Sequence, residues 1–156
     1  MNQILISVAS VAFTLVSTPV LAKPDAVSLS SDVKVDKTVL KDGKATHVLV
    51  APQQVVPGDV LVFSTQFRNN GGIPVEGFVV TDPLPQGIAY STDGSDNAVV
   101  SVDDGKTWGT LNALTVPDGK GGARPAQASD VTHIRWSVAV IAPGGSGSVS
   151  YRGIVL

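Results

Sequence analysis

The chain has 156 residues and no cysteine. This absence excludes disulfide bonds, thiol catalysis and cysteine-ligated metals, and it excludes a lipoprotein anchor, which needs a cysteine directly after the signal. Aromatic residues make up 5% of the chain, and glutamate occurs once, at Glu76. Helix surfaces draw on Glu, Lys, Leu and Ala, whereas β-branched residues such as the abundant valine suit a pleated sheet. The composition therefore argues against a helical or doubly wound protein.

Charge is also scarce, and its distribution is uneven. The formal net charge is −2, and no charged residue precedes Lys23. A nucleic-acid-binding domain would show a basic face and a high isoelectric point, so we expect no nucleic-acid partner. The uncharged, apolar segment 1–22 ends in Val20-Leu21-Ala22, small or modest residues that suit cleavage by signal peptidase. We therefore predict a signal peptide over 1–22, although its first three residues lack Lys and Arg.

The alternative for this segment is an uncleaved N-terminal anchor, since it is nearly long enough to span a bilayer. Pro19 and the Ser and Thr residues within it favour the cleaved signal. No second apolar segment approaches the length of a membrane-spanning helix. We thus expect an exported chain, periplasmic or extracellular, with no membrane span after cleavage.

After a polar lead at 23–30, the pattern is that of short strands separated by turn residues. The predicted strands are 31–37, 46–51, 60–68, 73–82, 88–91, 99–102, 131–141 and 147–155. Segment 112–129 has little strand pattern and is predicted to be an exposed loop. Seven to eight short strands with regular turns are typical of an all-β, immunoglobulin-like β-sandwich of antiparallel strands, here a single domain over 31–156.

Alternation along the two clearest strands predicts which side chains face the core. On the first strand these are Leu61, Phe63, Thr65 and Phe67. On the second they are Ile134, Trp136, Val138 and Val140, opposite His133, Arg135 and Ser137. Trp136 is expected in the core in every interpretation.

Several motifs together resemble a known family. A Pro-Gly-Asp turn at 57–59 opens a strand that closes in Asn69-Asn70-Gly71, and Val79-Val80-Thr81-Asp82-Pro83-Leu84-Pro85-Gln86-Gly87 follows. Segments 101–108 and 143–147 add to the likeness. This chain resembles the bacterial surface family called domain of unknown function eleven over about 31–156. The resemblance implies an immunoglobulin-like sandwich in exported proteins, usually in tandem arrays that act as stalks or spacers, whereas this chain carries one copy.

No catalytic motif is recognisable. The sequence has no Gly-x-Ser-x-Gly elbow, no His-Glu-x-x-His pair and no phosphate-binding glycine loop. His47 and His133 lie on strands far apart in sequence, and His133 suits a solvated position. We therefore predict that the protein is not an enzyme and uses no cofactor.

Two clusters of aspartates could bind calcium: Asp93 with Asp96, and Asp103 with Asp104. Calcium takes six to eight oxygen ligands, which sandwich loops can supply. The spacing is not that of an EF-hand, and Asp and Asn are also the residues that tight turns need. The turn interpretation is favoured, and no metal is expected.

Lys37, Asn69 and Asp82 are the elements of an isopeptide bond, in which a neutral lysine attacks an asparagine amide beside an acid. That chemistry needs an apolar pocket that keeps the lysine uncharged and the acid protonated. Asp82 precedes Pro83 at a strand end, and Asn69 lies in a turn, so both positions are expected to be wet. A surface lysine beside an Asx turn is the favoured interpretation.

Trp108 is a possible platform for a sugar or a partner. A two-residue Asp104-Gly105 loop would place Trp108 opposite Ser101, whereas a three-residue loop from Asp103 would place it opposite Val100. The second register pairs apolar with apolar, so we favour a buried or half-buried Trp108.

The function expected from these features is an exported, non-enzymatic immunoglobulin-like module with a structural or protein-interaction role, at the cell envelope or outside the cell. Its partner is not identified by the sequence. The alternative is a ligand-binding sandwich that captures a glycan, with or without calcium.

Overall fold

A computed structural model describes residues 26–93 and 98–156. The signal peptide predicted over 1–22 and the start of the polar lead lie outside the described residues, as does Asp96. The described chain is all-β, with ten strands and two short 3-10 helices. All eight predicted strands are present, so the predicted all-β fold of antiparallel strands is confirmed.

The larger sheet has five strands in the order β2-β1-β3-β10-β5, and each neighbouring pair is antiparallel. Its members are β1 (Val27–Lys41), β2 (Lys44–Val50), β3 (Val60–Asn69), β5 (Ile88–Ser91) and β10 (Ser146–Val155). β1 is the longest strand, and it pairs with β3 from Val27 to Asp36 and with β2 from Val35 to Lys41. The last part of β1 therefore leaves the sheet with β2 as its only neighbour.

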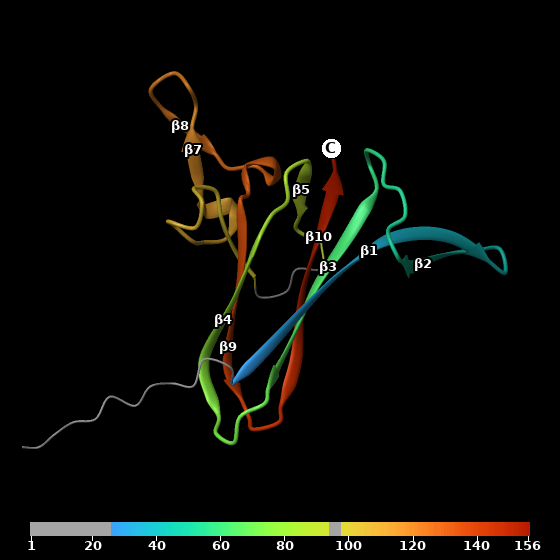
Figure 1. Ribbon diagram of the computed structural model, residues 1–156. Coiled ribbons are helices and arrows are strands. Elements are labelled where there is room, and N and C mark those ends of the chain that lie inside the picture. Colours follow the sequence, from blue (N-terminus) through green and yellow to red (C-terminus); the bar gives the residue numbers. More distant parts are fainter. Residues whose placement is uncertain (1–25, 94–97) are drawn as a thin grey trace, which may run out of the picture.

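The smaller sheet has the order β4-β9-β6 and faces the larger one (Figure 1). Its strands are β4 (Val75–Pro83), β6 (Val99–Ser101) and β9 (His133–Ile141). In chain order, successive strands change between these two sheets from β3 to β4, from β4 to β5, from β5 to β6, and from β9 to β10. The two layers form a β-sandwich, and the immunoglobulin-like strand order stays a prediction.

The core lies between the two sheets, and both contribute to it. Trp136 from the smaller sheet is 4% exposed, and its ring centroid lies 6.1 Å from that of Tyr151 in the larger sheet. Tyr151 in turn stacks on Phe63 at 4.7 Å. The predicted burial of Trp136 is confirmed. On β3, Leu61, Thr65 and Phe67 are buried while Gln66 and Arg68 are exposed, as the alternation predicts.

The alternation predicted for β9 is wrong at its end. Val140 is 55% exposed, and Ile141 takes the core position instead. The cause lies in the neighbouring strand, where Gly77 has a φ of +60°. A left-handed residue interrupts the pleat, so Val75 and Phe78 both contact the core although three positions separate them. The paired end of β9 follows this change of face.

Two predicted boundaries also differ from the structure. β1 begins at Val27, inside the predicted polar lead, because Ser28 and Ser30 pair with Arg68 and Gln66 despite their polarity. The predicted loop 112–129 is instead an ordered excursion. It contains the 3-10 helices Leu111–Ala113 and Ala128–Asp130 and the hairpin of β7 (Thr115–Pro117) and β8 (Ala123–Pro125).

Candidate functional site

Two hairpins extend from the sandwich (Figure 1). One is the far part of β1 with β2, residues 37–50, which we call the β1–β2 arm. The other is the β7–β8 hairpin within residues 111–130, which we call the excursion. They differ in their side-chain contacts: polar side chains of the excursion bond to one another, whereas the arm exposes apolar side chains.

The β1–β2 arm is built by a two-residue turn. Asp42 and Gly43 have φ values of +53° and +75°, which is the type I′ geometry that Asp-Gly favours and that matches the twist of a hairpin. Lys41 and Lys44 close the turn as cross-strand partners. The local sequence therefore favours the turn that closes this hairpin.

Both faces of the arm carry exposed apolar side chains. The exposed fractions are 39% for Val39, 80% for Leu40, 52% for Leu49 and 40% for Val50. Leu40 and Leu49 share one face with Ala45, since Leu40 pairs with Ala45 and Asp36 with Leu49. Val39 and Val50 lie on the opposite face. Apolar side chains on both faces are typical of a strand that is covered on both sides.

Leu40 and Leu49 belong to no sequence motif that marks them as functional residues. The available signal was the run Val48-Leu49-Val50, which places apolar residues on both faces of a strand next to a tight hairpin. What the sequence does not reveal is that β3 ends its pairing at Asp36 and leaves this hairpin uncovered.

The base of the arm is held by two groups of ions. The Asp36 side chain is 4% exposed and contacts Arg152 from β10, and its Oδ1 lies 2.9 Å from Nδ1 of His47. Nearby, Nζ of Lys37 donates to Oδ1 of Asp59 at 3.0 Å. The pKa of Asp59 is lowered by a hydrogen bond from the Val56 amide and by Lys37. These contacts fix where the arm leaves the body.

His47 has one feature of a catalytic base, since the Asp36 carboxylate orients its ring. Among the described residues, Asp36 is its only hydrogen-bond partner, and no hydroxyl reaches its ring. His133 lies elsewhere, with Nδ1 3.1 Å from Oγ1 of Thr132. The two histidines are thus in separate places, each with a local polar partner.

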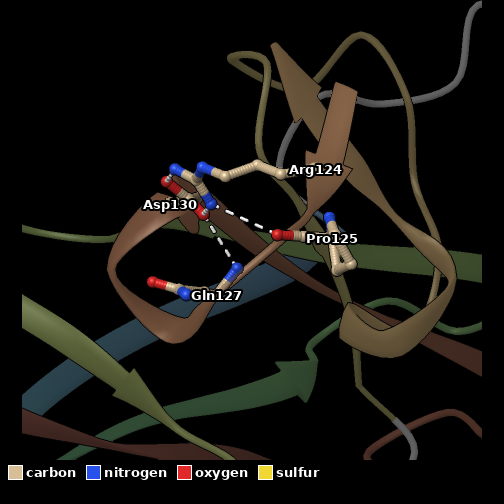
Figure 2. Close-up of polar contacts among 4 residues, drawn as sticks. All are labelled: Arg124, Pro125, Gln127 and Asp130. Carbon is tan, nitrogen blue, oxygen red and sulfur yellow. Dashed lines mark hydrogen bonds and ion pairs between the residues drawn. The ribbon is translucent and has the colours of Figure 1, made fainter. Parts of the chain in front are cut away.

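The excursion is closed by polar contacts of its own (Figure 2). Arg124 donates from both terminal nitrogens to the two oxygens of Asp130, each at 2.7 Å. The Gln127 amide donates to Oδ2 of Asp130 at 2.8 Å. The pKa of Asp130 is lowered, chiefly by the hydrogen bonds from Arg124. At the tip, Asp118 accepts from the amides of Lys120 and Gly122.

The aspartates proposed for calcium are engaged in turns. Asp103 accepts from the amides of Lys106 and Thr107 and from the hydroxyls of Ser101 and Thr107. These bonds, led by the Thr107 amide, lower the pKa of Asp103 to about 2. The structure therefore shows the Asp103 carboxylate as the acceptor that organises its own turn.

The other members of that set do not converge on Asp103 in the described structure. Asp104 has a φ of +59° and is exposed, with its amide donating to Thr132 Oγ1. The Asp93 amide donates to the Ser91 hydroxyl. Asp96 lies outside the described residues. Within 26–93 and 98–156, no group of three or more His, Cys, Asp or Glu side chains could hold a metal ion.

The isopeptide residues are apart. Asn69 pairs with Val27 at the start of β1, ten residues before Lys37, which corresponds to about 33 Å along the strand. Lys37 is instead paired with Asp59. Asp82 accepts a hydrogen bond from Thr65 at 3.0 Å. The structure does not bring the three residues together.

The expectation that Asn69 is exposed to solvent is wrong, because the residue is fully buried. Its Oδ1 accepts from the Gly71 amide at 2.9 Å, which is the predicted Asx turn. Its Nδ2 donates to the carbonyls of Ile73 and Ile141, at 2.8 and 3.0 Å. Asn69 thereby joins the end of β3 to the end of β9, across the two sheets.

The register favoured for Trp108 is wrong, although the side chain is half-buried as predicted. Val100 exchanges both backbone hydrogen bonds with Gly109, which places Trp108 opposite Ser101. Asp104 and Gly105 both have positive φ, so the two-residue loop is the one that forms. The hydrogen bonds to Asp103 stabilise that loop, a contribution that apolar matching does not consider.

One face of the Trp108 ring is covered, which weighs against its use as a sugar platform. The Arg135 guanidinium carbon lies 3.6 Å from the ring centroid and covers one face. The indole Nε1 donates to the Gly105 carbonyl at 2.9 Å, and the ring packs beside Gly105. The Arg135 side chain thus lies between Trp108 and Thr81, to which its Nε donates at 3.4 Å.

Other proteins add no further information about this site. No helix in the described parts of the chain has the length and apolarity needed to cross a membrane. Comparisons of the chain with family models, curated proteins and solved structures find no match. The candidate site therefore depends on the geometry of this chain, and its best-defined feature is the apolar β1–β2 arm.

Proposed function

We propose that this protein is an exported, non-enzymatic, immunoglobulin-like module that binds another protein through the β1–β2 arm. The observation that carries the proposal is the exposure of Leu40 and Leu49 on a hairpin that leaves the body. Exposed strand edges and contiguous apolar side chains are features of protein-binding surfaces. The predicted signal peptide over 1–22 and the sequence resemblance to domain of unknown function eleven support a site of action in the envelope or outside the cell.

Binding by strand addition suits this arm. An extended segment that pairs with an open strand edge gains main-chain hydrogen bonds, and alternate side chains provide specificity. Within the described residues, β2 has β1 as its only strand neighbour. The edge of β2 is seven residues long and contains no proline, so nothing in its backbone prevents a further strand from pairing.

A photo-crosslinking experiment in cells tests the proposal. A photoreactive amino acid is placed at Leu40, at Leu49 or, as a control, at Gln66, which is exposed on the body of the larger sheet. We expect covalent protein adducts from both arm positions and few from Gln66. Equal labelling at all three positions would contradict a role for the arm, and retention of the protein in the cytoplasm would contradict export.

A further inference from the structure

The edge of β2 has a defined pattern of free backbone groups. Because the Asp42-Gly43 turn has two residues, its closing pair, Lys41 with Lys44, exchanges both hydrogen bonds. Hydrogen-bonded and non-hydrogen-bonded pairs then alternate along the hairpin. Ala45, His47 and Leu49 are consequently the residues whose amide and carbonyl groups point away from β1.

The outward-pointing backbone groups of one β2 strand can pair with those of a second, identical β2 strand. If a second β2 lies antiparallel to the first with the two His47 residues opposite each other, Ala45 of each copy faces Leu49 of the other. All three outward-pointing residues then find outward-pointing partners, and the whole of β2 is used. Leu40 and Ala45 of one copy already pair with each other. Together with Leu49 of the second copy, which faces Ala45, they form one continuous apolar row. This row occurs twice, once for each copy.

The charges on the arm are compatible with the same arrangement. The tip carries Lys41 and Lys44 beside Asp42, whereas the aspartates at the base are already paired, Asp36 with Arg152 and Asp59 with Lys37. An antiparallel pairing keeps the two basic tips apart, and Lys44 faces Val50 rather than a second lysine. A parallel pairing would bring the two basic tips together. The antiparallel register is therefore favoured by charge as well as by apolar matching.

In the described structure, the arm beyond Asp36 has two strands and no third strand beside it. A two-stranded hairpin is marginally stable in water, and three or more strands with an apolar face are needed for independent stability. Joining two arms by their β2 edges converts two such hairpins into one four-stranded sheet. A single contact removes the open edge of both copies, as in other symmetric dimers.

We propose, building on the function proposed above, that the partner of the arm is a second copy of this chain. The two β2 strands pair antiparallel about a twofold axis that passes between the His47 residues. The dimer thus forms through the arms and leaves the sandwiches at its two ends.

The absence of cysteine makes a disulfide-trapping test possible. In the proposed register the two His47 Cα atoms lie about 5.5 Å apart, within the range that a disulfide spans. His47→Cys in the mature chain is therefore expected to give disulfide-linked dimers under mild oxidation. Ala45→Cys is the matched control, on the same strand and face and also exposed. Its Cα lies about 13 Å along the strand from its own copy, four residues away in register.

We expect His47→Cys to form dimers at least about tenfold faster than Ala45→Cys, because only the first satisfies the disulfide distance. The double variant Ala45→Cys/Leu49→Cys should regain efficient dimer formation. Equal rates for His47→Cys and Ala45→Cys would overturn the register. Light scattering of the unsubstituted mature chain should show a dimer, and Leu40→Ser/Leu49→Ser should shift it to a monomer.

The same measurements separate this inference from the proposed function. A chain that stays monomeric at all concentrations overturns self-pairing. If the photoreactive residue at Leu40 still forms adducts with a different protein in that case, the arm is an interaction site for a heterologous partner. If Leu40 forms no adducts at all, both the self-pairing and the interaction role of the arm are wrong.

Discussion

The two hairpins of this protein show how similar local structures can have different consequences. The excursion around β7 and β8 joins Arg124 to both oxygens of Asp130 and caps its own tip with Asp118. The β1–β2 arm has its ionic contacts at its base only, at Asp36 and Lys37, and exposes Leu40 at 80%. The excursion satisfies its own polar groups, whereas the arm leaves apolar surface that a partner could cover.

This comparison implies that stability belongs to the body of the sandwich and that the arm contributes little to it. Variants in the body, in the excursion and in the arm should therefore differ in the size and kind of their effects.

Trp136→Ala should have the largest effect. Removing a buried large aromatic side chain costs about 3–5 kcal/mol, and Trp136 contacts Tyr151 across the two sheets. Chemical denaturation followed by circular dichroism measures the change in the free energy of unfolding. A loss below about 1 kcal/mol would mean that Trp136 does not carry the core.

Asn69→Ala should destabilise the body by about 1–3 kcal/mol, because a fully buried hydrogen-bonding side chain is replaced and the buried Ile141 carbonyl loses its donor. The affected groups are the carbonyls of Ile73 and Ile141 and the amide of Gly71. The neighbouring exposed residue provides the control, since Asn70→Ala should cost far less. Similar losses for the two variants would contradict the bridging role of Asn69.

Asp130→Asn should have a smaller effect that depends on pH, because partly exposed ion pairs contribute modestly. The folded pKa of Asp130 lies below its ordinary value of 3.8, owing first to Arg124. Its stabilising contribution is then fully present well above that ordinary value, and it is lost as the pH falls from there through the folded pKa. Thermal unfolding of wild type and variant should differ at pH 7 and converge on acidification. A difference that stays constant down to pH 2 would contradict this role.

Leu40→Ser/Leu49→Ser should have the smallest effect on the isolated chain, within about 0.5 kcal/mol at low protein concentration. Exposed side chains away from the core contribute little to folding. At high concentration the wild type should unfold at a higher temperature than the variant, because association stabilises the folded state by mass action. A large destabilisation at every concentration would show that the arm belongs to the folding unit after all.

The β1 strand illustrates how far sequence reasoning reaches. The sequence predicted strands at 31–37 and 46–51, and the Asp42-Gly43 turn that joins them in the structure is one that local sequence favours. The sequence did not show that β1 runs from Val27 to Lys41 or that β3 pairs with its first ten residues only. Those limits depend on where a strand distant in sequence ends.

Contacts between side chains show the same difference between what local sequence predicts and what distant residues decide. Asp36 and Arg152 are separated by 116 positions, and no local pattern predicts that they meet. Apolar matching predicts the wrong register for Trp108, because it does not include the hydrogen bonds that Asp103 accepts in its turn. Asn69 was correctly predicted in an Asx turn, but its burial depends on Ile141, which comes from another strand.

By itself, then, the sequence determined the all-β class, the positions of the eight main strands and the burial of Trp136, because periodicity and turn residues act over a few positions. Only the tertiary structure decided that Lys37 and Asn69 lie far apart, that Asn69 is buried and that Leu40 and Leu49 are exposed. These outcomes depend on which distant strands pair and on how far each pairing extends. They are set by packing between the sheets, to which residues far apart in the chain contribute together.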